Sequence, residues 1–479
     1  MSSNQSTAKM NWDLGSYFPE YDGPEMKDFK KKLKADIASV QKKAAALPSL
    51  GADNMAEWEE IILEAEDIMS RYSHIDSYIG CLASADGLNE DYVREEGEMS
   101  TVHAELSKLK VELIRALKGV PEEVFRRFTE REKLSDAAYY IGRLRILSER
   151  SMSPEKEILA SDLGVDGISA WGRLYDTVSS RLEFEMKYPD GTVKTLPISQ
   201  RRSLMEKSDR DIRKAAFEGG NRAWKTIEDT AAAALNAISG TRLTLNKYRG
   251  IDHFLDDAQK LVEKSFSASY PALGTYAQSA FDKRWIDWAP REGKRPGGFC
   301  TGSLLTKESR IFMTYNETLG DVLTLAHEAG HAFHSHVMSD IRPYSHFYPM
   351  TLAESASTFG EMILTEGILR EPSIGNAEKA LMLDTEINHG AIYLMDIPVR
   401  YEFEKAFYEE RKEGEVSVSR LKELMAQTQR RVFGDVLEEG GEDPYFWASK
   451  LHFYIVGVTF YNFPYTFGYL LSRGLFSLF

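Results

Sequence analysis

Apolar residues recur at helical spacing through most of the first third of the chain. In one stretch the apolar positions fall three or four residues apart, which places them on one face of a helix: Trp58, Ile61, Ile62, Ala65 and Ile68. Charged runs such as 27–34 separate such positions and read as solvated helix faces. The pattern predicts successive amphipathic helices over residues 19–160 and again over 199–247. We place a soft boundary between two lobes near residue 200.

Two stretches break the helical pattern. Residues 184–188 and 192–196 flank Pro189-Asp190-Gly191, which predicts a β-hairpin around a turn. Further on, Gly297 and Gly298 precede an apolar run, and a polar stretch separates that run from residues 310–315. This second region predicts two antiparallel strands that lead directly into the next helix.

Composition and charge narrow the class of protein. Hydrophobic residues make up 43% and aromatic residues 11% of the 479 residues, enough for a substantial core. A net charge of −15 argues against binding to nucleic acid or to anionic membranes, because phosphate would be repelled. The two cysteines, Cys81 and Cys300, suggest a reducing compartment. The first residues lack a basic segment followed by an apolar run, so we expect no signal peptide and a cytoplasmic protein.

The chemistry centres on the predicted helix 323–337. It contains His327-Glu328-Ala329-Gly330-His331, and Thr318 with Asp321 has the form of a capping box at its start. Residues four apart lie one turn above each other, so His327 and His331 aim two imidazoles at one point, as Zn²⁺ ligands would. Glu328 then sits beside the metal, where a general base for metal-bound water belongs.

A catalytic zinc needs a third protein ligand and an open position. We predict that Glu354, in the helical stretch 352–361, is that ligand, which gives a His₂Glu set as in thermolysin-like enzymes. Glu361 lies two turns further along the same face. It could orient a ligand histidine or form an ordinary salt bridge, and both readings stay open. His334 and His336 read as ordinary helix residues.

Two further regions could contact a substrate. An edge strand at Gly297, Gly298 and Phe299 could hold an extended peptide, or the hairpin could be purely structural. The aromatic run 451–471 reads as a core helix broken at Pro464. The polar residues of this run argue against a membrane tail. His452 and the tyrosines of the run could instead donate hydrogen bonds to an oxyanion.

The chain resembles the M3 family of zinc metallopeptidases, the thimet oligopeptidase and oligoendopeptidase F group, and most of all the oligoendopeptidase F branch. The matching stretches are WIDWAPREGKRPGGFC, ESRIFMTYN, LAHEAGHAFHS, LAESASTFGE, VRYEFEKAFYEERKEGE and HFYIVGVTFYNFPYTFGYLLS. The resemblance implies one zinc ion per chain on His327, His331 and Glu354, with Glu328 as base. It also implies catalytic or substrate-binding roles for His452, Tyr461 and Tyr465, while Phe463 stands where relatives often have tyrosine.

The resemblance further implies a mainly α-helical, two-lobed fold: a helical lobe over 1–200 and a zincin-like catalytic domain with a small β-sheet over 201–479. A central channel would admit short peptides. The chain is short between Leu255 and Leu273 and stops after the tyrosine segment, where relatives continue. We therefore expect a metalloendopeptidase acting on short peptides, without nucleic-acid or membrane partners. The sequence does not predict its oligomeric state.

Two alternatives stay open. The first is a peptide-binding homologue with weak or no activity, because pieces of the fold are missing. The second is a di-iron helical bundle, which uses two E-x-x-H motifs and two further glutamates. The parts for the second are present: Glu328-x-x-His331, Glu386-x-x-His389, Glu354 and Glu361. In such a di-iron site, however, His327 would have no role.

Overall fold

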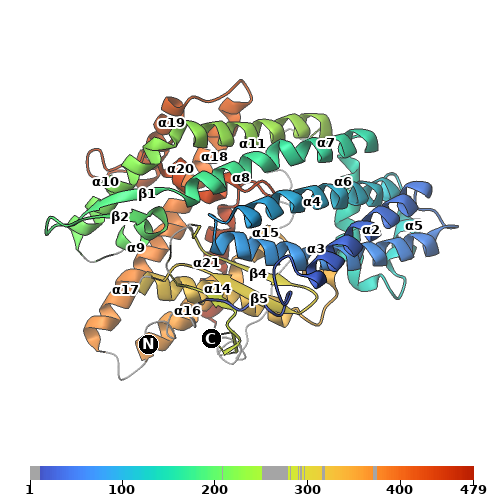
Figure 1. Cartoon of the computed structure of the whole chain (residues 1–479), viewed down its shortest axis with the longest axis horizontal. Helices are drawn as coiled ribbons and strands as arrows, with labels where there is room; N and C mark the ends of the chain where they lie inside the picture. The colour runs from blue at the N-terminus through green and yellow to red at the C-terminus, as the bar shows by residue number, and fades with distance from the viewer. Residues whose placement is uncertain are drawn as a thin grey trace.

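The computed structural model describes residues 11–250 except 206 and 208, and residues 279–478 except 281, 290, 292, 293, 296, 316–318 and 371–374. Within these ranges the fold is mainly α-helical with small β-sheets, which confirms the predicted class (Figure 1). The helices before the first hairpin are α2 Pro24–Ala46, α3 Met55–Ala85, α4 Glu90–Leu117, α5 Glu122–Thr129, α6 Ala138–Glu149, α7 Pro154–Asp166 and α8 Ile168–Ser180.

The later helices include those predicted over residues 199–247 and around the motif, and others that the sequence analysis did not predict. They are α9 Arg201–Met205, α10 Arg210–Thr226, α11 Glu228–Arg249, α14 Leu319–Val337, α15 Met350–Ala353, α16 Ser355–Arg370, α17 Asn376–Ala391, α18 Ile397–Arg411, α19 Val418–Phe433, α20 Phe446–Ser449 and α21 Phe463–Phe476. Local capping explains several of these ends. Asn89 accepts hydrogen bonds from the first amides of α4, and Gly250 ends α11 in the left-handed conformation, with φ of 68°.

The described hydrophobic residues pack into two large cores. Helices α2–α6 gather at one end of the molecule around the first core (Figure 1), where the apolar face predicted for residues 58–68 is buried. The second core joins α8, β1, α10 and α11 to α18, α19 and residues 446–460. Residues on both sides of residue 200 share this second core. A lobe boundary there stays a prediction.

Both predicted strand pairs form. Strands β1 (Glu183–Lys187) and β2 (Val193–Pro197) make an antiparallel hairpin. Strands β4 (Phe299–Ser303) and β5 (Glu308–Phe312) are also antiparallel and lie before α14. A further strand that the sequence pattern does not predict, β3 (Ile286–Asp287), pairs parallel to β5 and gives the order β3-β5-β4. Two residues are too few for a periodic pattern to show.

Two details of the helices differ from the sequence prediction. Glu354 does not lie within a continuous helix: α15 ends at Ala353, α16 begins at Ser355, and Glu354 takes φ of −95° and ψ of 0° at the corner between them. Pro464 lies in the first turn of α21, which begins at Phe463, instead of breaking a helix, since its fixed φ suits that turn. Thr318 of the predicted capping box and the shortened region 255–273 lie outside the described residues.

Close backbone contacts hold the helices that carry the motif. A Cβ at Gly330 of α14 would lie 2.4 Å from the carbonyl oxygen of Ala356 at the start of α16. A Cβ at Gly468 of α21 would lie 2.7 Å from the carbonyl carbon of Glu354. Only glycine allows these approaches, so α14 and α21 both pack tightly against the corner that carries Glu354.

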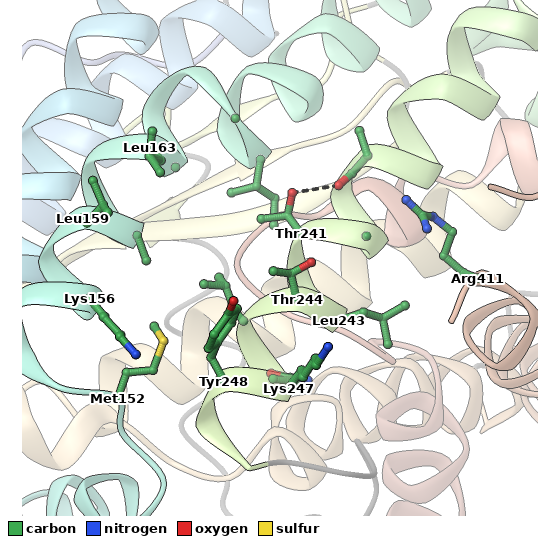
Figure 2. A pocket seen from close by; sticks show the side chains of 18 of the residues that line it. Met152, Lys156, Leu159, Leu163, Thr241, Leu243, Thr244, Lys247, Tyr248 and Arg411 are labelled. Carbon is green, nitrogen blue, oxygen red and sulfur yellow. Dashed lines mark hydrogen bonds between the residues drawn. The ribbon is translucent and has the colours of Figure 1, made fainter. Parts of the chain in front are cut away.

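A cavity of about 1240 Å³ lies between α7, the start of α8 and the second half of α11 (Figure 2). Leu159, Leu163, Leu243 and Tyr248 are among the side chains that line it, together with Arg411 at the end of α18. None of the predicted site residues lines this cavity. In the described part of the chain, no helix is both long enough and apolar enough to cross a membrane.

Candidate metal centre

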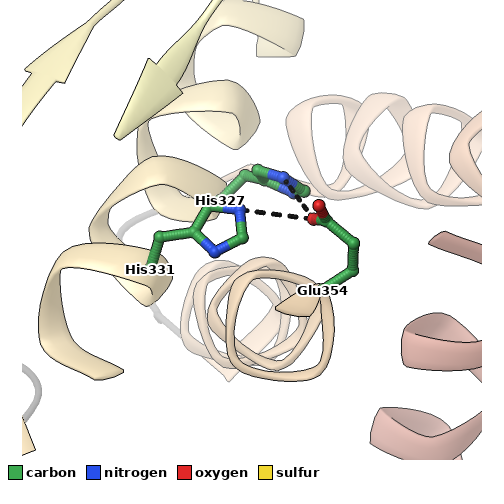
Figure 3. A group of neighbouring side chains, drawn as sticks. All are labelled: His327, His331 and Glu354. Carbon is green, nitrogen blue, oxygen red and sulfur yellow. Dashed lines mark ion pairs between the residues drawn. The ribbon is translucent and has the colours of Figure 1, made fainter. Parts of the chain in front are cut away.

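Three side chains from two neighbouring parts of the fold converge on one point (Figure 3). His327 and His331 come from successive turns of α14, and Glu354 comes from the corner between α15 and α16. The Glu354 Oε2 atom lies 3.1 Å from His327 Nε2 and 3.3 Å from His331 Nε2. Among the described residues, this trio is the one group of three or more His, Cys, Asp or Glu side chains that could hold a metal ion.

These separations fit a tetrahedral zinc site. Two ligand atoms at 2.0–2.1 Å from zinc, at a tetrahedral angle, lie about 3.3 Å apart. The two rings are nearly perpendicular, at 84°, so both Nε2 atoms face the carboxylate from different directions. His334 packs its ring 4.7 Å from that of Tyr348 and is not part of the trio. The described residues therefore offer three ligands, the number typical of catalytic zinc.

The Glu354 carboxylate is fixed on both oxygens. Tyr461 donates a hydrogen bond to Oε1 at 2.7 Å, and Ser357 donates one to Oε2 at 2.9 Å. The side chain is 1% exposed. Burial alone would raise its pKa, but the two histidines hold the pKa well below its ordinary value. The group is thus an ionised carboxylate held in one orientation, as a metal ligand must be.

Glu361 contacts His327 at Nδ1, the ring nitrogen that does not face Glu354. Its Oε1 accepts hydrogen bonds from His327 Nδ1 and from the Tyr393 hydroxyl, both at 2.6 Å, and its Oε2 lies 2.9 Å from His389 Nδ1. Burial raises the pKa of Glu361, but the two histidines outweigh this and lower it to about 2. A carboxylate on Nδ1 keeps the proton there and leaves Nε2 free for a metal. Of the two readings left open for Glu361, this geometry favours the orienting partner.

The di-iron arrangement is not assembled. His389, which the alternative needs as a metal ligand, instead contacts Glu361 from α17. Glu386 accepts a hydrogen bond from Thr365 at 3.0 Å and pairs with Arg473. Neither Glu386 nor His389 joins the group that could hold a metal among the described residues. The E-x-x-H match at His389 therefore does not form a metal site, and His389 is a partner of Glu361.

Glu328 follows His327 on α14 and is 5% exposed. Its Oε2 is buried and has no hydrogen-bond partner among the described residues. Burial raises the pKa of this carboxyl, while His327 and His331 lower it in part. A Cβ at Gly298 would lie 3.1 Å from the other oxygen, Oε1. An unsatisfied carboxylate with a raised pKa, next to the ligands, is suited to accept and return a proton.

The predicted substrate strand lies against this carboxylate. Gly297, with φ of 104°, and Gly298 lead into β4, which begins at Phe299. Strand β4 is at one edge of its three-stranded sheet. The Phe299 ring stacks on Phe312 of β5 with centroids 5.0 Å apart, so this residue also serves the sheet's packing. Peptide binding and a purely structural hairpin both remain compatible with this arrangement.

The C-terminal segment reaches the same site. His452 Nε2 lies 3.0 Å from the Tyr465 hydroxyl, and the Tyr465 ring centroid lies 6.3 Å from that of His327. Burial lowers the pKa of His452 to about 3, with help from Arg400 and Lys450, so the imidazole is neutral at pH 7. Together with Tyr461 on Glu354, all three predicted residues of this segment surround the metal trio.

Two buried ionisable side chains, which no sequence pattern indicated, hold the loop that carries Tyr461. Glu404 of α18 accepts hydrogen bonds from the Phe460 amide at 2.9 Å and from Asn462 Nδ2 at 2.7 Å. Arg242 of α11 donates to the carbonyl oxygens of Val458, at 2.8 Å, and Ile455. Their sequence neighbourhoods read as ordinary amphipathic helix, so only tertiary contacts could reveal the role.

Comparison with known proteins agrees with this geometry. Residues 273–479 match the model of Peptidase family M3, and residues 117–184 match the model of Oligopeptidase F. The two matches together cover more than half of the chain, and the first contains the whole metal trio. The chain belongs to peptidase family M3. The predicted resemblance is therefore confirmed.

Similar M3 family proteins come from several bacteria. A chromosomal oligoendopeptidase F of Lactococcus lactis is 36% identical over 198 residues, which is 40% of this chain and 31% of the relative. The chain thus matches about a third of the length of this relative. Oligopeptidase PepF of Bacillus subtilis is 22% identical over 552 residues, covering 98% of this chain and 78% of its own length. Those 552 positions exceed this chain's 479 residues, so the relative has additional residues within the matched range.

Solved structures support the M3 fold. Oligoendopeptidase-F from Enterococcus faecium superposes with a TM-score of 0.67 at 19% identity, over 94% of this chain and 87% of that one. PZ peptidase A with an inhibitor gives a TM-score of 0.69 at 17% identity, with the same coverage of 94% and 87%. At such low identity, the likeness concerns the fold alone.

Proposed function

We propose that this M3 family chain is a zinc-dependent endopeptidase that hydrolyses short peptides. The observation that carries the proposal is the position of Glu354 Oε2, 3.1 Å and 3.3 Å from the Nε2 atoms of His327 and His331. The unsatisfied carboxylate of Glu328 lies on the same helix as both histidines. A binding module has no use for a buried, unpaired carboxylate at this point, whereas peptide hydrolysis needs one.

His327, His331 and Glu354 would hold the zinc ion. When bound, zinc supplies Lewis acidity that acidifies a water molecule and polarises the scissile carbonyl. Glu361 keeps the His327 proton on Nδ1, and Tyr461 and Ser357 keep the Glu354 carboxylate turned toward the histidines. These partners hold the three ligands in place before a substrate arrives.

Glu328 moves the proton. Its carboxylate removes a proton from the water that attacks the scissile carbonyl carbon, and the same proton then passes to the nitrogen of the leaving amine. One C–N bond breaks, one C–O bond forms, and the products are a carboxylic acid and an amine. The hydroxyl of Tyr465, which contacts neutral His452, donates a hydrogen bond to the oxyanion that forms on the carbonyl.

The alternative of a weakly active or inactive peptide-binding homologue has one observation in its favour. The Bacillus subtilis relative has residues that this chain lacks within the matched range. The pieces that this chain does have include every residue to which the mechanism above assigns a role. We therefore favour the active enzyme, and a central peptide channel remains part of the proposal.

An internally quenched peptide assay tests the function. Purified protein should cleave the peptide, lose activity with a chelator and regain it when zinc is added back. Glu328→Gln should keep the zinc and lose at least about a hundredfold in kcat, since general base catalysis contributes that much or more. Cleavage by Glu328→Gln near the wild-type rate would rule out the base. No cleavage by the zinc-loaded wild type would support the inactive homologue.

A further inference from the structure

Lys450 is a half-buried ionisable side chain that the mechanism above does not use. It lies between α20 and the turn 451–454, two residues before His452. Its ammonium group stands 4.4 Å from the centroid of the Phe446 ring. The described residues place no carboxylate or carbonyl oxygen within hydrogen-bonding distance of it. Burial and the nearby Arg400 lower its pKa to about 7.

Two arginine side chains lie near Lys450. The Arg400 guanidinium faces the same Phe446 ring at 5.5 Å. Its Nη2 pairs with Asp396 at 2.6 Å, but its Nε is buried without a hydrogen-bond partner among the described residues. Arg202 of α9 is close enough that its charge lowers the pKa values of both Lys450 and His452. Asp396 opposes these charges and raises the pKa of Lys450 in part.

This cluster adjoins the reacting groups. The charge of Arg202 also lowers the pKa values of Glu328 and Tyr465, so Arg202 lies near the metal trio as well as near Lys450. Like charges held together in a low-dielectric site repel each other, and an anion that enters relieves the repulsion. In a chain with a net charge of −15, a positive wall beside the active site is a local reversal of the overall charge.

We propose that Lys450, with Arg400 and Arg202, forms a carboxylate-binding subsite beside His452, and that preferred substrates carry a carboxylate that reaches it. The inference rests on the proposed peptidase function, because the anions of a peptide are its C-terminal carboxylate and the side chains of Asp and Glu. Lys450 is the specificity-determining member, since it has no other anionic partner among the described residues. Arg400 and Arg202 strengthen the local positive field.

The test uses the zinc-loaded full chain and a set of quenched peptides. One pair differs only in a free or an amidated C-terminus, and the other pairs exchange Glu for Gln at successive positions. Because each residue advances an extended peptide by about 3.3 Å, the best position also reports the distance to the subsite. The wild type should favour at least one carboxylate-bearing peptide by about ten- to a hundredfold in kcat/KM, mainly through KM. A chain-end preference identifies the C-terminal carboxylate, and a single Glu position identifies a side chain.

Lys450→Gln should bring this preference to within about twofold of unity. Lys450→Arg should keep most of it, because the charge remains, and the exposed surface control Lys31→Gln should keep all of it. The inference is overturned if the wild type shows no preference, or if Lys450→Gln keeps it. A binding assay separates the subsite from the peptidase function. It compares the affinities of the same peptides, labelled with a fluorophore, for Glu328→Gln and for the double variant Glu328→Gln/Lys450→Gln. A Lys450-dependent carboxylate preference in binding, without any cleavage by the wild type, would support the subsite and refute the peptidase.

Discussion

The contact between α14 and α16 gives a sharp prediction for Gly330→Ala. The new Cβ would lie 2.4 Å from the carbonyl oxygen of Ala356 and 2.7 Å from the Cα of Ser357. Ordinary contact begins near 3.4 Å, so the start of α16 must move by about 1 Å. Both clashing atoms belong to rigid backbone two and three residues after Glu354. The shift is therefore transmitted to the third ligand.

The magnitudes follow from this displacement. Overpacking costs about 1–3 kcal/mol, and replacing a helical glycine by alanine returns about 1 kcal/mol, so the free energy of unfolding should fall by about 0–2 kcal/mol. Metal sites tolerate deviations of about 0.2 Å, and a shift of about 1 Å is several times larger. We expect zinc to bind at least about tenfold more weakly, a loss of at least about 1.4 kcal/mol in binding free energy.

The assay compares Gly330→Ala with a matched variant. Gly367 lies in α16 and faces open space, so Gly367→Ala should stabilise the protein by about 0.5–1 kcal/mol and leave zinc binding unchanged. Zinc affinity is measured by competition with a fluorescent chelator, and stability by denaturant unfolding of the metal-free proteins. If Gly330→Ala binds zinc like the wild type and gains the same stability as Gly367→Ala, the close helix contact does not position Glu354.

Three other variants test separate contacts. Glu361→Gln should weaken zinc binding by about 10–100-fold, because His327 loses its ionised partner; unchanged affinity in the competition assay would contradict this. Tyr461→Phe removes a hydrogen bond of 2.7 Å to Glu354 and should lower zinc affinity by about threefold to tenfold, measured in the same way. Burial raises the pKa of Glu404 to about 7, so the folded state holds this proton between pH 4.5 and 7 while the unfolded state releases it, and stability falls as pH rises through this window. Urea unfolding at several pH values should show that Glu404→Gln removes this part of the slope; an unchanged slope would argue against it.

The helices and hairpins of this chain could be predicted because their signals are local. The face formed by Trp58, Ile61 and Ile68 repeats at helical spacing, and the turn at 189–191 separates two strand-like runs. The spacing of His327 and His331 fixes their common direction once a helix is assumed. These parts needed no knowledge of distant contacts.

The surroundings of the site depend on contacts that no local pattern records. Glu404 and Arg242 sit in ordinary amphipathic helices, and only the fold brings them to the loop at Tyr461. The corner at Glu354 interrupts a stretch whose composition suits a continuous helix, and Gly468 packs closely against this corner. The spacing of Glu386 and His389 matched a di-iron motif, but His389 contacts Glu361 instead, because spacing alone cannot tell a metal from a carboxylate.

Zinc content is the most direct test of the metal trio. The wild-type protein, purified and dialysed against metal-free buffer, should contain one zinc ion per chain by elemental analysis. Glu354→Ala should lose it, whereas the matched variant His334→Ala should keep it, because His334 lies on the same helix but outside the trio. Retention of one zinc per chain with wild-type affinity in Glu354→Ala would contradict the central claim.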